Sequence, residues 1–166
     1  MKRILLIIIV IISLINVYGF STVRKNNKAV KLIQDTLLYN AEEMLQKYLE
    51  SAPDNPILNY NYGVVKLRQF EEQNNKQSGL ESAIESFEKT KADTTKSILH
   101  STYYNQANAY YGLGNYPKAI NNYQESATYL DSTEIDPALL YNYANSLYKL
   151  AEANAEYDSL FTIAQE

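Results

Sequence analysis

The chain has 166 residues, of which 46% are hydrophobic, and a formal net charge of −4. This length suits one domain of ordinary size, and this apolar content can fill a core, so an intrinsically disordered chain is excluded. Cysteine is absent, which excludes a disulfide framework and thiolate metal sites, and the weakly acidic balance without a basic block argues against nucleic acid as the main partner.

The N-terminal segment has the charge and hydropathy order of a secretory signal. Two basic residues precede an apolar run within residues 4–17, and this order is typical of exported proteins. The apolar core of about 14 residues is shorter than the roughly 20 that a membrane-spanning helix needs. Val17 and Gly19 are small enough for a signal peptidase site, so we expect cleavage after Gly19. An uncleaved membrane tether is the alternative. Either form predicts a location in the periplasm or on the periplasmic face of the inner membrane.

Beyond this segment, the chain carries repeated signals for the starts and ends of helices. Asn55-Pro56 and Asp136-Pro137 each place a capping side chain before a proline that suits the first helical position. The stretch Asp93–Thr95 predicts another start, and Gly112–Asn115 predicts a break before a helix that restarts near Pro117. Alternating runs typical of strands are absent. The sequence therefore predicts an all-α fold.

Two kinds of helical segment alternate along the chain. The first kind places a small residue after a polar or Tyr-Asn stretch, at separations of 34, 44 and 37 residues: Ala29, Gly63, Ala107 and Ala144. The second kind has Ala followed four residues later by a large apolar or aromatic residue, which places both on one helical face: Ala41 and Leu45, Ala83 and Phe87, Ala119 and Tyr123. We expect the small residues to let neighbouring helices approach closely.

This alternation resembles the tetratricopeptide repeat (TPR), a helix–turn–helix unit of 34 residues. The best copy is His100–Thr133, which matches through Ala107, Tyr110, Ala119 and Tyr123, and the second copy has extra residues around 71–79. The resemblance implies a short right-handed solenoid over residues 22–166. Its units are expected at about 22–55, 56–92, 100–133 and 137–166, the last being a degenerate cap.

A narrower resemblance is to the TPR proteins of Bacteroides-type aerotolerance (Bat) operons. The opening Val23–Lys28 and the Thr94-Thr95 insertion before the third unit are similar to features of that group. This resemblance implies an aerotolerance or stress-related membrane complex, with envelope membrane proteins as partners.

The TPR resemblance also implies a concave groove lined by the first helix of each unit. Tyrosine gives a large contact area with little entropy loss, and asparagine can bond to the backbone of an extended peptide. The expected partner-binding residues are Tyr60, Asn61, Val64, Arg68, Tyr104, Asn105, Asn108, Tyr111, Tyr141, Asn142, Asn145 and Tyr148. Chaperone-binding members hold a C-terminal carboxylate with lysine, where this chain has tyrosine, so capture of an acidic tail is not expected.

The sequence offers no catalytic, cofactor or metal motif. The single histidine, His100, is predicted to be an exposed surface residue and not a general base. The favoured function is therefore a non-catalytic adaptor that binds a peptide or helix of another protein. Two alternatives are open: a self-associating structural module, and a cell-wall glycan binder that uses exposed tyrosines.

Overall fold

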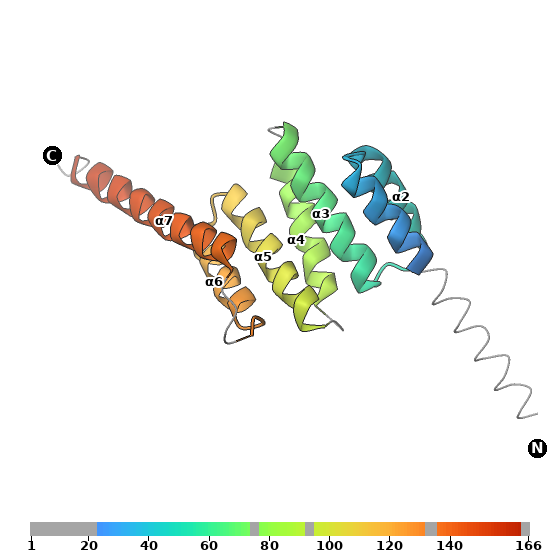
Figure 1. The fold of residues 1–166 in the computed structure, drawn as a ribbon. Helices are drawn as coiled ribbons and strands as arrows, with labels where there is room; N and C mark the ends of the chain where they lie inside the picture. The colour runs from blue at the N-terminus through green and yellow to red at the C-terminus, as the bar shows by residue number, and fades with distance from the viewer. Residues whose placement is uncertain (1–22, 74–76, 92–94, 132–135, 164–166) are drawn as a thin grey trace, which may run out of the picture.

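The computed structural model describes residues 23–73, 77–91, 95–131 and 136–163, and over these ranges the chain is helical, with short turns between the helices (Figure 1). A helix over residues 23–34 comes first. It is followed by α2 (Leu38–Ser51), α3 (Pro56–Gln73), α4 (Gln77–Thr90), α5 (Lys96–Gly112), α6 (Tyr116–Ala127) and α7 (Pro137–Ile163).

No strand occurs in these ranges, so the predicted all-α class is confirmed for them. The expected signal or anchor over residues 1–19 lies outside the described residues. None of the helices in the described part of the chain is long and apolar enough to cross a membrane.

The helices form two layers that follow the chain in pairs. Helix α3 packs against α4 and α5 packs against α6, and neighbouring pairs meet where α4 contacts α5 and α6 contacts α7. Helices α3, α5 and α7 are the first helices of their units, and α2, α4 and α6 are second helices. The first helices contact one another, α3 with α5 and α5 with α7, whereas the second helices make no contact with one another. A stack whose first helices lie closer together than its second helices curves with the first helices inside. Helices α3, α5 and α7 therefore line the concave face.

The predicted capping signals act at the starts of helices. The Asn55 side-chain oxygen accepts a hydrogen bond from the Leu58 N–H at 3.0 Å. One carboxylate oxygen of Asp136 accepts from the Leu139 N–H at 3.2 Å at the start of α7. Each of these bonds satisfies a backbone donor that the first helical turn leaves unpaired. Thr95 stands at the N-cap of α5 without a side-chain capping bond, although this start was also expected.

The predicted break after the third unit's first helix is also present. Helix α5 ends at Gly112, and Gly114 has a φ of 72°, a left-handed conformation that glycine adopts without steric cost. Asn115 then caps α6 by accepting from the Lys118 N–H at 3.3 Å. The turn and the next helix start thus follow from adjacent residues.

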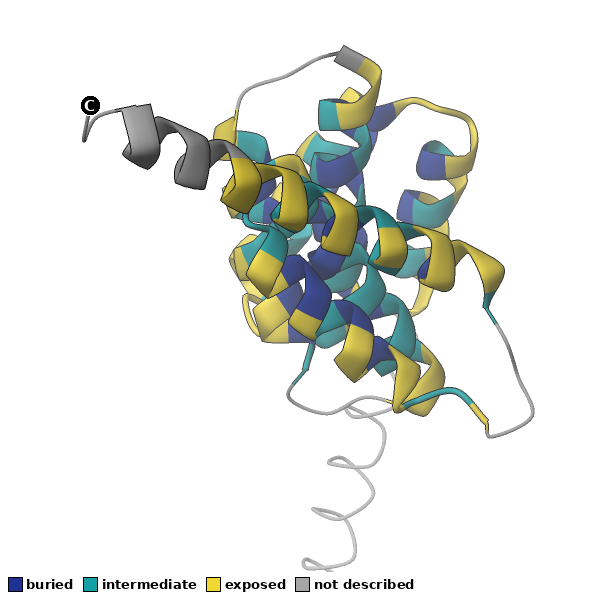
Figure 2. Cartoon of the chain, turned by 90° about the vertical axis from the view of Figure 1, so that its left-hand side faces the viewer, coloured by how far each residue is buried: buried dark blue, intermediate teal, exposed yellow. Residues whose placement is uncertain are grey.

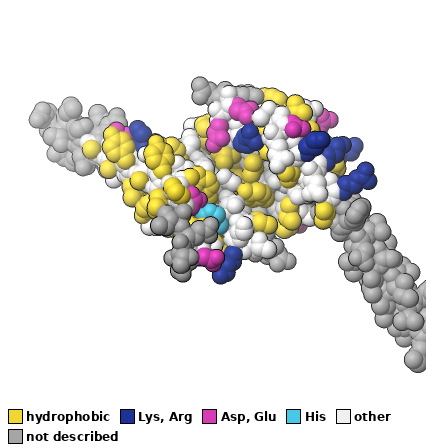
Figure 3. All heavy atoms as spheres, viewed as in Figure 1, with side chains coloured by type: hydrophobic (Ala, Val, Ile, Leu, Met, Phe, Trp, Pro, Cys, Tyr) yellow, Lys and Arg dark blue, Asp and Glu magenta, His cyan; other side chains and the backbone are white. Residues whose placement is uncertain are grey.

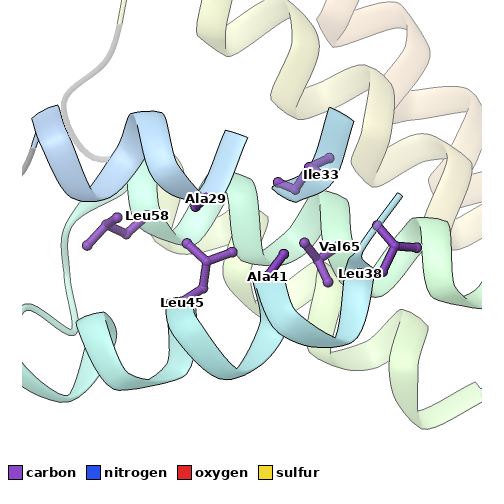
Figure 4. Packing of buried hydrophobic residues seen from close by; sticks show 7 residues of the cluster. All are labelled: Ala29, Ile33, Leu38, Ala41, Leu45, Leu58 and Val65. Atoms are coloured by element: carbon purple, nitrogen blue, oxygen red, sulfur yellow. The ribbon is translucent and has the colours of Figure 1, made fainter. Parts of the chain in front are cut away.

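The core sits where the small residues of facing helices meet. Ala29, Ala41, Ala83, Ala107 and Ala119 each have 0% exposure, as the spacing predicted. Figure 4 shows the first part of this core, where large side chains such as Leu45 and Leu58 surround Ala29 and Ala41. Close helix approach at small residues therefore repeats along the stack.

Ala144 does not share this environment. It was expected to pack like Ala29, Gly63 and Ala107, but it is exposed on α7. The reason is that α7 continues unbroken for 27 residues, so no second helix of its own unit returns to cover Ala144 within the described residues. The prediction of an equivalent, closely packed place for Ala144 is wrong.

Candidate interaction groove

A cavity of about 420 Å³ lies on the concave face, between three successive first helices. Its walls come from α3, α5 and α7, and one side chain of α6 reaches into it from the second layer. The lining residues are Leu67, Phe70, Glu71, Tyr104, Asn108, Tyr111, Gly112, Tyr123, Asn142 and Asn145. The middle wall follows from helical geometry, because Tyr104, Asn108 and Tyr111 are four and three residues apart and therefore share one face of α5.

A chain of asparagine hydrogen bonds ties the first helices together. The Asn61 side-chain amide donates to the side-chain oxygen of Asn26. One unit later the Asn105 amide donates to the Tyr60 hydroxyl at 3.2 Å. The Asn142 amide then donates to the Tyr104 hydroxyl at 2.9 Å.

We call this series the asparagine ladder: Asn61, Asn105 and Asn142, each bonded to the residue at the preceding position of the preceding unit (Asn26, Tyr60 and Tyr104). Because each of these bonds joins two neighbouring units, the asparagines hold successive units in register. The sequence assigned the same asparagines to partner binding, and the ladder shows a structural role for them.

The floor of the cavity is a network of neutral polar groups. The Tyr123 hydroxyl donates to the Asn108 side-chain oxygen, which also accepts from the Asn142 amide at 3.2 Å. Tyr123 is only 1% exposed, and its ring lies 5.9 Å from that of Tyr104 between centroids. This network joins α5, α6 and α7, so the floor is pre-organised.

Three tyrosines of this face resist ionisation more strongly than tyrosine in water. Burial raises the pKa of Tyr60, Tyr104 and Tyr123, because an ionised phenol is poorly solvated there; hydrogen bonds from neighbouring side chains, such as the one from Asn105 to Tyr60, offset only part of the effect. Neutral hydroxyls both donate and accept hydrogen bonds. The groove therefore presents amphipathic rings without a tyrosinate charge at neutral pH.

Two polar groups of the cavity are left available for a ligand. The Tyr111 hydroxyl and the Asn145 side-chain amide make no hydrogen bond to another described residue, although the Tyr111 ring packs edge-on against Tyr116 at 5.5 Å between centroids. Both groups lie on the same cavity as the satisfied floor network. They are the natural hydrogen-bonding sites for an incoming chain.

One carboxyl group, that of Glu71, lies on the wall formed by α3. Glu71 is an exposed residue of α3; desolvation of its carboxyl by neighbouring atoms raises its pKa, and the nearby charge of Arg68 counteracts this only in part. Arg68 is directed elsewhere: its guanidinium donates to the Ile33 carbonyl at 2.9 Å and lies 3.8 Å from the Glu72 carboxylate. Among the described residues Glu71 has no cation within ion-pair distance. An exposed carboxylate with no paired cation can accept a positively charged ligand group at this wall.

Solved structures of other proteins share this architecture. No protein-family model matches the chain, and no curated protein matches it. The TPR domain of Sgt2 from Aspergillus fumigatus is similar, with a TM-score of 0.63 over 80% of each chain and 17% sequence identity. The fold is that of a TPR domain. An identity this low speaks for the TPR fold alone, so the chemistry of the groove rests on the residues of this chain.

The structure brings together only part of the set that the TPR resemblance implied. The residues that line the cavity are Tyr104, Asn108, Tyr111, Asn142 and Asn145. The expected α3 residues lie beside it in other contacts: Tyr60 packs on Phe87, Val64 joins the core, and Arg68 binds a carbonyl of the preceding unit. Tyr141 and Tyr148 do not line the cavity, being 69% and 62% exposed on another face of α7.

The sequence reasoning missed Phe70, Glu71 and Tyr123 as cavity residues. Phe70 could have been found, since it lies one turn after Leu67 on α3. Tyr123 had been assigned to packing between helices, which its burial confirms, but its hydroxyl also reaches the groove. No sequence signal distinguishes Glu71 from the neighbouring exposed acids.

The prediction that His100 is an exposed surface residue is wrong. Its side chain is only 18% exposed, and its ring lies 3.5 Å from the Asp136 carboxylate and 2.9 Å from the Ser126 hydroxyl. This grouping of Ser, His and Asp is not a hydrolase triad, because Ser126 is fully buried and donates to the His100 carbonyl. The three side chains instead join α5, α6 and the start of α7. Within the described residues no cluster of acidic or histidine side chains is arranged to hold a metal ion.

Proposed function

We propose that this protein is a non-catalytic adaptor whose concave TPR groove binds a segment of another protein. The observation that carries the proposal is the cavity between α3, α5 and α7, in which a satisfied polar floor lies beside the free Tyr111 hydroxyl and Asn145 amide. Rigid rings flanked by free hydrogen-bonding groups suit an extended peptide or a helix, because the rings give contact area and the polar groups fix the register.

The chemistry of the walls favours a ligand with both apolar and basic side chains. Phe70 offers a partly exposed apolar ring on α3, Leu67 lies beside the cavity with only 5% exposure, and Tyr111 lines the same cavity from α5. Next to this surface the exposed Glu71 carboxylate lacks a paired cation, so a lysine or arginine of the ligand can form a charge-assisted hydrogen bond with it. The ligand that fits is therefore a short segment with an apolar side chain next to a basic one.

The proposed setting is the bacterial cell envelope. Support comes from the signal-like order of residues 1–19 and from the resemblance of the chain to TPR proteins of aerotolerance operons. The partners would be envelope membrane proteins, within a stress-related membrane complex. Cleavage after Gly19 would release the TPR domain into the periplasm, and an uncleaved segment would tether it to the inner membrane.

Peptide display against the full chain tests the groove. We expect selected peptides to combine aromatic or aliphatic residues with lysine or arginine. Tyr111→Ala should weaken binding of a selected peptide roughly tenfold or more, as truncation of a central aromatic contact does. Glu71→Gln should weaken basic peptides and leave neutral analogues unchanged. The matched control is Tyr39→Ala, an exposed tyrosine of α2 outside the cavity. Equal losses for Tyr111→Ala and Tyr39→Ala would refute the groove as the binding site.

A further inference from the structure

The last helix carries an exposed apolar face that is separate from the groove. Leu140, Tyr141, Leu147 and Tyr148 are 53%, 69%, 43% and 62% exposed, and Ala144 and Ala151 are exposed between them. We call these six residues the α7 face. Figure 2 shows exposed residues along α7, and Figure 3 shows hydrophobic side chains gathered over the same helix. These six residues are uncharged, and the Lys149 ammonium lies at the edge of the face, 5.8 Å from the centroid of the Tyr148 ring.

The α7 face has a seven-residue repeat. Leucine recurs at 140 and 147, tyrosine at 141 and 148, and alanine at 144 and 151. On a helix these positions form two rows of large side chains with a row of small ones between them. Rows of large and small side chains that run along a helix suit lengthwise packing against another helix. A segment that lies across α7, such as a groove-bound peptide, would not require such rows.

Equivalent faces on the preceding first helices are covered. On α3, a Cβ atom at Gly63 would lie 2.6 Å from the Phe87 ring of α4, so the two helices are in close contact there. On α5, Ala107 has 0% exposure and packs with Tyr123 of α6. Ala144 holds the corresponding repeat position on α7, and no described helix covers it. The series of helix contacts along the stack thus continues to α7 and ends with an open face.

We infer that the α7 face pairs with the α7 face of a second copy of this chain, in an antiparallel, two-fold symmetric dimer. Under that symmetry, residue 140 of each copy lies at the same height along the paired helices as residue 151 of the other copy. The face is therefore complementary to itself. Leu140 of each copy then lies at the level of the small Ala151 of the other, and Leu147 at the level of Ala144. The alanine rows allow close approach of the helices, and the leucine and tyrosine rows close over both sides.

The position of Glu152 favours the antiparallel arrangement. In a parallel pair, Glu152 of each copy would lie at the same level as its own equivalent, which places like charges side by side. In the antiparallel pair, Glu152 of each copy lies at the level of Leu139 of the other, so the two carboxylates are separated along the helix axis. The solenoid body covers the opposite side of α7, through α6, and leaves the α7 face free.

Thiol cross-linking of the full chain in cells tests this pairing, because the natural chain has no cysteine. Two differently tagged copies are co-expressed, one with Leu140→Cys and the other with Ala151→Cys, and treated with a short thiol–thiol cross-linker. We expect a covalent dimer that carries both tags, at several times the yield from Asn121→Cys, an exposed position on α6 that serves as the control. Mixed-tag yield no higher than this control would overturn the proposal.

The cross-linked products distinguish the remaining occupants of the face. Self-pairing of Leu140→Cys copies, stronger than pairing with Ala151→Cys copies, would indicate a parallel pair and overturn the antiparallel one. A product of the chain with a different protein would also overturn the proposal. A chain that stays monomeric while both introduced thiols are protected from labelling would overturn the proposal as well, because its own C-terminal segment would then cover the face.

A charge variant gives an independent measurement. Ala144→Glu combined with Leu147→Glu places four carboxylates at the centre of the proposed dimer, which should weaken dimerisation roughly tenfold or more in sedimentation of the purified full chain in mild detergent. Both positions are exposed, so the circular dichroism spectrum should not change. The inference does not depend on the groove, and binding of groove peptides should be retained. An unchanged dimerisation constant in a folded variant would overturn it.

Discussion

Gly63→Ala tests the close contact between α3 and α4. The new methyl group would lie 2.6, 2.9 and 2.9 Å from three atoms of the Phe87 ring, where ordinary contacts begin at 3.4 Å. The ring is 0% exposed, so it has no solvent to move into. Overpacking of this kind costs about 1–3 kcal/mol, and the better helix propensity of alanine returns about 0.5–1 kcal/mol. We therefore expect a net loss of about 1–2 kcal/mol, or a midpoint lower by roughly 3–6 °C.

Thermal and urea unfolding followed by circular dichroism would measure this change, and Gly79→Ala is the matched control. Gly79 also lies in a helix, but its nearest neighbour to an added Cβ is the Lys66 carbonyl at 3.9 Å, so alanine there should stabilise the chain slightly. In a Phe87→Leu background the Gly63→Ala loss should fall below about 0.5 kcal/mol, because the ring that causes it is absent. Equal stability of Gly63→Ala and Gly79→Ala would refute the close contact.

Three further predictions concern the ladder, the buried tyrosines and the turn before α6. Asn105→Ala should cost about 1 kcal/mol in urea unfolding, because it removes the bond to the Tyr60 hydroxyl, whereas exposed Asn121→Ala should change stability by less than about 0.5 kcal/mol. Burial raises the pKa of Tyr123 above the ordinary 10.0, so the stability that the neutral phenol contributes is complete below pH 10 and is lost as pH rises through the raised pKa. In an alkaline titration, the last part of the tyrosinate absorbance should appear together with loss of the helical circular dichroism signal. Ionisation of all tyrosines in a single phase near pH 10 would contradict this. Gly114→Ala should cost about 1 kcal/mol from the left-handed backbone alone, since a Cβ there meets nothing within 4 Å, and Gly114→Asn should be milder in the same assay.

The helices and their core could be predicted from the sequence because the deciding signals are local. Asn55 and Asp136 cap the helices they precede, and Gly114 adopts the turn that ends α5. The small residues at Ala29 and Ala107 recur at repeat spacing, and each lies in the core. Such signals depend on neighbours within a few residues or on a period in the chain, and both are visible without coordinates.

The role of the asparagines could not be predicted, because it depends on the distance between units. Asn105 and Asn142 were assigned to the groove on their position in the repeat, and both lie near it. Whether their amides face a ligand or the preceding helix is decided by how closely α3, α5 and α7 approach one another. The same limit applies to His100. Its neighbours in the sequence are Ser and Thr, which suggested an exposed position, whereas in the fold α6 and the start of α7 pack against its side chain.

The last unit shows why burial does not follow from repeat position. Ala144 has the same place in the pattern as Ala107, yet one is exposed and the other has 0% exposure. The difference lies downstream: α5 is followed by the turn at Gly114 and a returning helix, whereas α7 continues to Ile163 with neither glycine nor proline to end it. Within the described residues, this packing face is thus left without a covering helix. Its rows of leucine, alanine and tyrosine suit lengthwise packing against a second α7, which would supply the missing cover.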